Sequence, residues 1–209
     1  MASSLTRRAE SQARTRRAVL EAAGQVFRRR DFATATLRPV AQEAGFTTGA
    51  IYANFSSKAE LAVAVLDELL NATQYDIFAA VDADLPLETQ LQQGVERLAQ
   101  DLAESEPLFR LELQCLLAAK EDADLADRLR RRATAAQDRL AATTQQRLAA
   151  VGYAATIPVQ DLAAILIDVV NGLALGRLLD SERASPEALT RGLLPMYLTY
   201  TAPLPSTMD

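Results

Sequence analysis

The 209-residue sequence predicts an all-α protein of about nine helices. Apolar residues recur at helical spacing along most of the chain, and no alternating pattern or long β-branched run predicts a strand. Proline and glycine separate the periodic stretches, as expected at helix ends. A chain of this length can bury a sizeable core, so we expect a small amino-terminal domain and a larger helical domain.

The first two helices follow from local signals. The first is predicted over residues 15–30, because an apolar stripe at helical spacing contains Val19, Ala22, Ala23, Val26 and Phe27. The second begins after Thr36, which is a favourable N-cap residue. It ends at Gly45, because glycine readily adopts the backbone conformation that closes a helix.

The third helix is predicted to be short, over residues 48–55. Ile51 and Phe55 lie four residues apart and face the core, which leaves small and polar side chains outside. Ser57 caps the fourth helix, and Glu60 three residues later completes the pattern of a capping box. We expect this helix to continue toward residue 81.

Five further helices fill the rest of the chain. Pro86 and Pro107 stand in the first turns of two of them, where a missing N–H is tolerated. A long amphipathic helix follows and ends at Gly152; its apolar stripe contains Leu125, Leu129, Ala136, Leu140, Leu148 and Val151. The next helix opens at Pro158 and reaches about residue 180. Ser185 then caps the last helix, with Pro186 at its first position.

Residues 36–61 contain two short helices around a glycine turn, with a third helix directly after them. Such a hairpin can place its second helix in the major groove of DNA. An ordinary helical hairpin has the same pattern, so the charge distribution decides. Residues 1–60 carry ten basic and five acidic side chains, whereas the other 149 residues carry 12 and 22. This concentration of positive charge in a chain of net charge −5 is typical of a nucleic-acid binder.

At these residues the chain resembles the TetR family of one-component bacterial transcriptional regulators. The resemblance covers about the first 60 residues and rests on residues 17–23 (RAVLEAA), Phe27, Asp31, Phe32, Thr36, Val40, Ala41, Ala44, Gly45, Gly49, Ile51, Tyr52, Phe55, Ser57, Lys58 and Leu61. The chain departs from the usual family pattern at four positions, with Asp31 for Gly, Pro39 for an acidic residue, Phe46 for Val and Asn54 for a frequent His.

The resemblance implies a domain organisation and a function. It implies a helix-turn-helix DNA-binding domain at residues 1–60 and a helical ligand-binding and dimerisation domain at residues 61–209. The protein would be a transcriptional regulator, and specifically a repressor that binds a palindromic operator in double-stranded DNA as a homodimer. A small molecule bound in the carboxyl-terminal domain would release the DNA.

The short third helix carries the predicted base contacts. Thr47, Thr48 and Ala50 have short side chains that suit base edges or thymine methyl groups. Gly49 would let the backbone approach DNA closely, because glycine inside a helix otherwise costs about 1 kcal/mol relative to alanine.

Phosphate contacts are predicted for five residues around that helix. Tyr52 and Asn54 carry neutral donors that can reach phosphate oxygens. Lys58 places a cation one residue inside a helix N-terminus, which itself attracts anions, and a solvated lysine is the alternative. Thr36 and Arg38 would face the DNA backbone across the groove.

The remaining arginines receive weaker roles. Those at positions 14, 16 and 17 are predicted to add diffuse attraction to DNA. Those at 28–30 could equally complement the dipole of the first helix. The arginines at 130–132 are interpreted as a solvated surface rather than a second DNA-binding patch.

Residues 161–179 are apolar over too much of their circumference for a helix that faces only one core. We expect a second burying surface, with Gly172 and Gly176 permitting close approach. Residues 171–175 (NGLAL) are similar to the dimer-forming helix of many family members. With residues 186–198 they would form a two-fold interface, so the homodimer would be made through the last two helices. Its two reading heads would lie about 34–36 Å apart along DNA.

The resemblance also implies an effector pocket in the helical body. Polar or aromatic groups on otherwise apolar helices could line it, or could fill the core or interface: Phe78, Phe109, Glu112, Gln114, Cys115, Tyr153, Asp168 and Asn171. Residues 107–128 resemble the family subset with betaine-regulator-like carboxyl-terminal domains. The expected effector is a small, largely apolar molecule with different affinities for two conformations. A regulator without a ligand is the alternative.

Other classes of protein are less favoured by the sequence. With no histidine, one cysteine and no glycine-rich phosphate loop, the chain lacks a nucleophile–base pair, so we expect no enzyme, no cofactor and no metal. Cys115 is interpreted as a buried apolar residue. A dimeric helical scaffold for protein partners remains an alternative. No signal peptide or membrane-length apolar run is found, so we expect a cytoplasmic protein.

Overall fold

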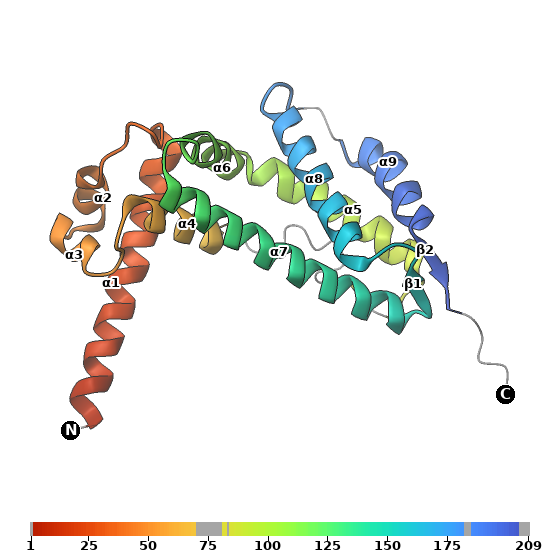
Figure 1. Cartoon of the computed structure of the whole chain (residues 1–209), viewed down its shortest axis with the longest axis horizontal. Coiled ribbons are helices and arrows are strands. Elements are labelled where there is room, and N and C mark those ends of the chain that lie inside the picture. The colour runs from red at the N-terminus through yellow and green to blue at the C-terminus, as the bar shows by residue number, and fades with distance from the viewer. Residues whose placement is uncertain (1, 70–80, 83, 182–184, 205–209) are drawn as a thin grey trace. The chain divides into compact units, whose positions relative to one another are not determined.

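The computed structural model describes residues 2–69, 81–82, 84–181 and 185–204, which form nine helices and two short strands (Figure 1). The predicted all-α fold is therefore confirmed. The chain divides into two compact units. Unit 1 contains Met1–Asn71 and Arg110–Arg132, and unit 2 contains Ala72–Phe109 and Ala133–Asp209. The division at residue 60 stays a prediction.

Unit 1 is a set of helices around α1 (Ala2–Arg29). α2 (Leu37–Ala44) and α4 (Lys58–Leu69) pack against α1, and α3 (Thr48–Tyr52) packs against α2. Unit 1 also contains the carboxyl-terminal part of α6 (Glu106–Ala118) and the first turns of α7 (Ala123–Ala150). Its buried side chains come from all of these helices and include Val19, Ala23, Phe27, Val40, Ile51, Phe55, Leu61, Val65, Leu66, Leu111, Cys115 and Leu125.

α1 is longer than the sequence pattern predicts. It begins at Ala2 instead of residue 15, and Figure 1 shows these first turns extending beyond the other helices of unit 1. Residues 9–14 are exposed, and the first buried residue after them is Val19. The prediction depends on apolar periodicity, which the exposed turns lack. They are rich in Ala, Arg, Glu and Gln, which favour a helix without packing partners.

Unit 2 contains α5 (Leu87–Glu104), α8 (Val159–Arg177), α9 (Pro186–Thr199) and the remaining parts of α6 and α7. α5 packs against α9. One apolar cluster joins the helices, with members that include Leu91, Val95, Leu98, Leu140, Leu148, Leu162, Leu166, Val170 and Tyr197. The predicted cap of α9 is confirmed, because the Ser185 hydroxyl accepts a hydrogen bond from the N–H of Ala188, and Pro186 is the first helical residue.

Two short strands depart from the prediction of an entirely helical chain. β1 (Tyr153–Ala155) and β2 (Thr201–Pro203) are antiparallel, with Ala154 opposite Ala202. The N–H of Leu204 also donates to the Gly152 carbonyl at 2.7 Å. Three residues are too few to show an alternating pattern, so these strands depend on pairing between segments far apart in the sequence.

α8 is apolar around most of its circumference, as predicted. It has a mean hydropathy of 1.5 and is long and apolar enough to cross a membrane by length and composition alone, with 28% of that stretch buried. Core helices of soluble proteins, which are mostly buried, meet the same criteria of length and composition. Leu162, Leu166 and Val170 are buried on one face, whereas Leu175 is 50% exposed.

Candidate nucleic-acid interface

The turn between α2 and α3 is fixed by backbone hydrogen bonds. Gly45 closes α2 with a φ of 72°, and its N–H donates to the Gln42 carbonyl at 3.3 Å. The N–H of Phe46 donates to the Ala41 carbonyl at 2.9 Å, which completes a Schellman motif. Glycine adopts this positive φ without strain. The residues from 41 to 46 therefore determine the direction in which the chain leaves α2.

α3 is anchored by two buried side chains and one cap. Ile51 is fully buried, and Phe55, four residues later, is 1% exposed. The Thr47 hydroxyl accepts a hydrogen bond from the N–H of Ala50 at 3.2 Å. A helix of five residues is not stable by itself, so these contacts hold it in place.

The outward face of α3 carries four of the residues predicted to meet DNA. Tyr52 is 56% exposed, Gly49 is exposed, and Thr48 and Ala50 are half-buried. A Cβ atom on Gly49 would meet only the Thr47 hydroxyl oxygen, at an ordinary distance of 3.7 Å. No packing within the described part of the chain therefore requires glycine at position 49. This face is small, polar and open, as contact with a DNA groove requires.

Residues at the start of α2 and in the turn after it are also open to solvent. Thr36 and Arg38 are exposed, and the Thr36 side chain makes no capping hydrogen bond although its backbone is that of an N-cap residue. Phe46 is 38% exposed and follows Gly45 directly. The sequence did not single out this aromatic ring as a contact, because the usual family residue at this position is smaller.

Lys58 is bonded within unit 1. Its ammonium donates to three backbone carbonyls of the loop between α1 and α2, at 2.9 Å to Phe32, 3.3 Å to Ala33 and 3.1 Å to Ala35. It also lies 4.5 Å from the centre of the Phe32 ring. An ammonium has three protons, so these acceptors use its full capacity. A phosphate contact by Lys58 would require it to leave these partners.

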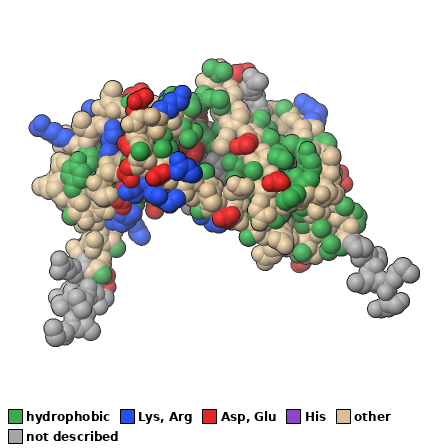
Figure 2. Space-filling view, viewed as in Figure 1, with side chains coloured by type: hydrophobic (Ala, Val, Ile, Leu, Met, Phe, Trp, Pro, Cys, Tyr) green, Lys and Arg blue, Asp and Glu red, His purple; other side chains and the backbone are tan. Residues whose placement is uncertain are grey.

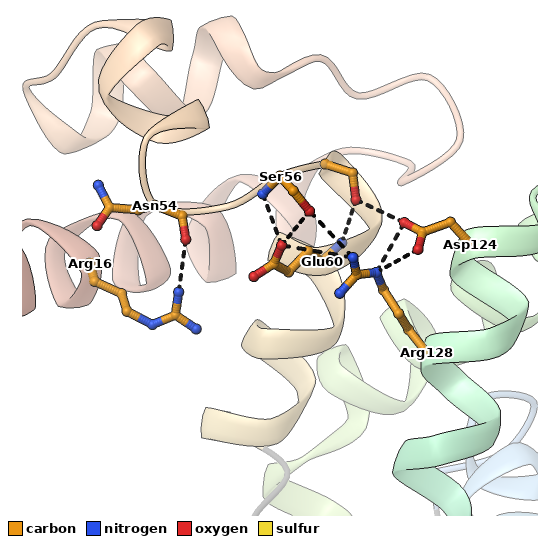
Figure 3. Close-up of polar contacts among 7 residues, drawn as sticks. Arg16, Asn54, Ser56, Glu60, Asp124 and Arg128 are labelled. Carbon is orange, nitrogen blue, oxygen red and sulfur yellow. Dashed lines mark hydrogen bonds and ion pairs between the residues drawn. The ribbon is translucent and has the colours of Figure 1, made fainter.

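Asn54 and Arg16 meet at the chain segment that follows α3 (Figure 3). The Asn54 side-chain amide donates to the Ala50 carbonyl at 2.9 Å, and its Oδ1 is buried without a hydrogen-bond partner in the described structure. Arg16 donates from Nη1 to the Asn54 backbone carbonyl at 3.1 Å and lies 4.2 Å from the centre of the Phe55 ring. Arg16 therefore holds this segment, a more specific role than the predicted diffuse attraction.

At the amino terminus of α4, Ser57 is the cap as predicted, but Glu60 bonds to Ser56 and not to Ser57. The Ser57 hydroxyl accepts a hydrogen bond from the N–H of Glu60 at 3.0 Å. The Glu60 carboxylate does not return to Ser57; it accepts from the N–H of Ser56 at 2.8 Å and from the Ser56 hydroxyl. These two bonds, with Arg128 and Arg16 nearby, hold the pKa of Glu60 below its ordinary value, although burial opposes them.

α7 supplies a polar bridge to the same segment (Figure 3). Arg128 donates from Nε to both carboxylate oxygens of Asp124, at 2.9 and 3.0 Å, and from Nη2 to the Ser56 hydroxyl at 3.3 Å. The same Nη2 lies 3.8 Å from Glu60 Oε2, and the Ser57 hydroxyl donates to Asp124 at 3.1 Å. The Arg128 bond, followed by the Ser57 bond, lowers the pKa of Asp124.

Sequence reasoning missed this bridge because its partners lie far apart. Only the spacing of Asp124 and Arg128, four residues apart on one helix, was a visible signal. The prediction of a solvated surface is wrong for Arg132, whose side chain is 9% exposed and pairs with Glu112 at 2.6 Å and Asp67 at 3.0 Å. It fits Arg130, which is 71% exposed.

Three of the predicted ligand-binding residues lie on α6 in unit 1. Glu112 is paired with Arg132, and the Gln114 side-chain oxygen accepts a hydrogen bond from the N–H of Phe32 at 3.0 Å. Cys115 is fully buried as predicted, and burial raises the pKa of its thiol to about 12. These side chains have partners or packing that hold unit 1 together.

The other predicted ligand-binding residues are dispersed over unit 2. Phe109 belongs to the apolar cluster, Tyr153 is part of β1, and Asp168 and Asn171 are exposed on α8. Phe78 lies outside the described residues. In the part of the chain that the structure describes, no group of three or more Cys, Asp or Glu side chains could hold a metal ion.

Comparison with known proteins gives matches in sequence at the amino-terminal end. Residues 19–65 match the family described as bacterial regulatory proteins, tetR family. The HTH-type transcriptional regulator TtgR of Pseudomonas putida is 46% identical over 66 residues. The match to the tetR family therefore covers the amino-terminal segment of the chain. The aligned segment spans 31% of this chain and 31% of TtgR, which is less than a third of either protein.

Solved structures of TetR-family proteins share the fold over most of the chain. A tetR-family transcriptional regulator from Streptomyces coelicolor has a TM-score of 0.67 at 18% identity, over 90% of this chain and 80% of that one. NalD, the secondary repressor of the MexAB-OprM multidrug efflux pump in Pseudomonas aeruginosa, has a TM-score of 0.60 at 22% identity, over 90% and 98%. The helix-turn-helix domain followed by further helices is therefore confirmed.

Proposed function

We propose that this chain is a TetR-family transcriptional repressor that binds double-stranded DNA with α3 in the major groove. The observation that supports this most directly is the division of α3 into two faces. Ile51 is fully buried, whereas Tyr52 and Gly49 are open to solvent. An exposed short helix at the end of a fixed turn can enter a groove without rearrangement of the unit that carries it.

The charge of the chain supports the same proposal. On the face shown in Figure 2, basic side chains are more numerous over unit 1 than over unit 2. Residues 1–60 hold ten basic and five acidic side chains, so positive charge surrounds the helix-turn-helix. This distribution attracts the phosphate backbone to one end of an otherwise acidic chain.

Each open residue of the helix-turn-helix receives a role in this proposal. Thr48 and Ala50 meet base edges, and the bare Gly49 lets the backbone approach the groove. Tyr52 donates its hydroxyl to a phosphate, and Thr36 and Arg38 meet the opposite strand. In this proposal Thr47 caps α3, Asn54 supports α3 through its bond to the Ala50 carbonyl, and Lys58 holds the loop between α1 and α2.

Selection from a pool of random duplexes, followed by fluorescence anisotropy titration, tests DNA binding. The selected duplex should bind at least about 1,000-fold more tightly than a scrambled one, with affinity falling steeply as salt rises. Tyr52→Phe should weaken binding about five-fold by removing one hydrogen bond. Tyr153→Phe makes the same chemical change in β1 and should leave binding unchanged.

A chain that shows neither preference among duplexes nor salt dependence would reject the proposal. The alternative would then be a helical scaffold for protein partners. We also infer a cytoplasmic location and no enzymatic activity, because relatives such as TtgR are described as transcriptional regulators.

We further infer that the repressor is a homodimer joined through α8 and α9. The exposed side chains on these helices include Leu175 and Leu198, which are 50% and 37% exposed. A Cβ atom on Gly172 or Gly192 would meet nothing within 4 Å, so both positions leave room for a second chain. Two heads related by two-fold symmetry would read a palindromic operator. Mass measurement by light scattering tests this, and a monomer at micromolar concentration would exclude it.

A small apolar effector is the final part of the proposal. Unit 2 contains a small apolar cavity of about 10 Å³ that is lined by Leu91, Val95, Leu98, Leu166, Val170, Leu193, Leu194 and Tyr197. The enclosed space holds about one water molecule, so an effector would have to separate these side chains. Such opening would give the two conformations different affinities for the effector. Thermal shifts with a library of apolar compounds test it, and operator release must accompany the shift.

A further inference from the structure

The turn between α3 and α4, residues 53–57, is held by side chains from three other places in unit 1 (Figure 3). Arg16 of α1 donates to the carbonyl of Asn54, and Glu60 of α4 accepts two hydrogen bonds from Ser56. Arg128 of α7 contacts Ser56 and Glu60. We infer that Arg128 is a positioning residue for DNA reading, because it fixes the turn that presents α3. This inference rests on the proposed function.

The geometry of Arg128 suits a bridge. Its side chain is 25% exposed, and one edge of the guanidinium meets Asp124 while Nη2 meets Ser56 and Glu60. The planar guanidinium offers its donors in a fixed arrangement. Because Asp124 lies on α7 as well, Arg128 sets the positions of Ser56 and Glu60 relative to α7. Arg128 uses two separate nitrogens for these partners, Nε for Asp124 and Nη2 for Ser56, whereas a lysine would have to reach both from one nitrogen.

Short backbone bonds connect the bridged turn to α3. The N–H of Ala53 donates to the Gly49 carbonyl at 3.0 Å, and the N–H groups of Asn54 and Phe55 both donate to the Ile51 carbonyl at 2.9 Å. Phe55 is the residue directly before Ser56 and is buried, as is Ile51. A displacement of Ser56 therefore acts on Phe55 and Ile51, which set the orientation of the reading face.

A purely electrostatic role for Arg128 makes a different prediction. As a cation it would attract DNA, and Glu60 as an anion would repel it. Glu60→Gln would then strengthen DNA binding while Arg128→Ala would weaken it. If the two residues act together to position the turn, both substitutions weaken binding, and the double variant is no weaker than the weaker single variant. The sign of the Glu60→Gln effect separates the two roles.

The experiment measures the affinity of each variant for the selected and the scrambled duplex. Arg128→Ala and Glu60→Gln should each weaken binding to the selected duplex about ten-fold, as expected for the loss of a charged hydrogen bond. Binding to the scrambled duplex should change less than about two-fold, because phosphate contacts remain. Arg130→Ala removes the same charge two positions along α7, where the side chain is 71% exposed, and should change neither affinity.

Hydrogen exchange in the absence of DNA gives a second readout. The amides of residues 53–55 should exchange faster in Arg128→Ala than in Arg130→Ala, while those of α1 stay unchanged. Tighter binding by Glu60→Gln, or equal exchange in the two arginine variants, would overturn the inference. Arg128→Lys should lie between wild type and Arg128→Ala, and it replaces the alanine variant if that variant does not fold. If no duplex is selected by the wild type, the proposed function fails and the exchange result still decides whether Arg128 holds the turn.

Discussion

Unit 1 and unit 2 differ in the interactions that stabilise each of them internally. In unit 1, polar side chains join residues far apart in the sequence, as in the bonds of Lys58 to the loop after α1 and of Arg132 to Glu112 and Asp67. In unit 2, an apolar cluster joins long helices, with Leu91, Leu162 and Tyr197 almost completely buried. Polar bonds have preferred directions, whereas apolar burial has none.

The difference follows from helix length. α2 and α3 have eight and five residues, so each buries little apolar area and needs directional bonds to fix its position. α5 and α8 have 18 and 19 residues and bury several large side chains each. A unit that must present a short helix at a defined angle therefore uses side-chain bridges. The other unit can repack more freely, which would suit the ligand-dependent change of conformation proposed above.

The largest expected change in the free energy of unfolding comes from a substitution in unit 2. Leu91→Ala should lower the free energy of unfolding by about 3 kcal/mol, because Leu91 is fully buried and the substitution leaves a cavity. Urea denaturation followed by circular dichroism measures this. Leu117→Ala makes the same change at a side chain that is 59% exposed and should cost less than about 0.5 kcal/mol. Equal effects at the two positions would contradict apolar burial as the basis of unit 2.

The next largest loss of stability is expected for a substitution of Lys58, which joins three carbonyls of unit 1. Lys58→Met keeps the aliphatic stem but leaves three carbonyls without their donor, so unfolding should become easier by about 2 kcal/mol. Lys120→Met, at an exposed lysine, is the matched control and should change stability by less than about 0.5 kcal/mol. If Lys58→Met weakens DNA binding while the unfolding free energy stays at its wild-type value, Lys58 contacts phosphate after all.

A smaller effect should depend on pH. The pKa of Glu60 is lowered first by the Ser56 hydroxyl, so the folded state favours the charged form. This stabilisation is present above the ordinary pKa of a glutamate and is lost as pH falls through the lowered value. The difference in unfolding free energy between wild type and Glu60→Gln should be below about 1 kcal/mol at neutral pH and vanish in acid. Ser56→Ala should reduce the dependence of the unfolding free energy on pH. If the difference between wild type and Glu60→Gln grew as the pH fell, the lowered pKa of Glu60 would be contradicted.

The smallest expected signal is the reaction of Cys115 with a thiol reagent in the native protein. Burial raises the pKa of this thiol to about 12, so the reactive thiolate is scarce and enclosed. Labelling should report opening of unit 1, and Lys58→Met should accelerate it more than Leu91→Ala does. Rapid labelling of the wild type would mean that unit 1 opens without unfolding.

Local signals explain why much of the fold could be predicted. Gly45 and Ser185 act on neighbours within a few residues, so the end of α2 and the start of α9 were visible in the sequence. The pair of Ile51 and Phe55 likewise specifies the inner face of α3. These predictions depend on single turns of chain, where spacing and residue type determine the hydrogen bonds.

Long-range partners explain what the sequence did not reveal. Lys58 bonds to carbonyls 23 to 26 residues away, so the sequence pattern could not distinguish a solvated lysine from a half-buried one that joins three carbonyls. Arg132 and the two short strands depend on segments that meet only after folding. The bonds of Glu112 to Arg132 and of Gln114 to the N–H of Phe32 were hidden in the same way, and the role of both residues in ligand binding stays a prediction.

The empty space beside Gly49 separates the needs of the folded chain from those of its partner. A methyl group there would meet only the Thr47 hydroxyl, at 3.7 Å, and would favour the helical backbone by about 1 kcal/mol. Selection for a sturdier polypeptide alone would therefore favour alanine at this site. The proposed approach of DNA to this position would explain why a hydrogen atom stands there instead, and mutagenesis aimed at thermal tolerance would be expected to erase it first.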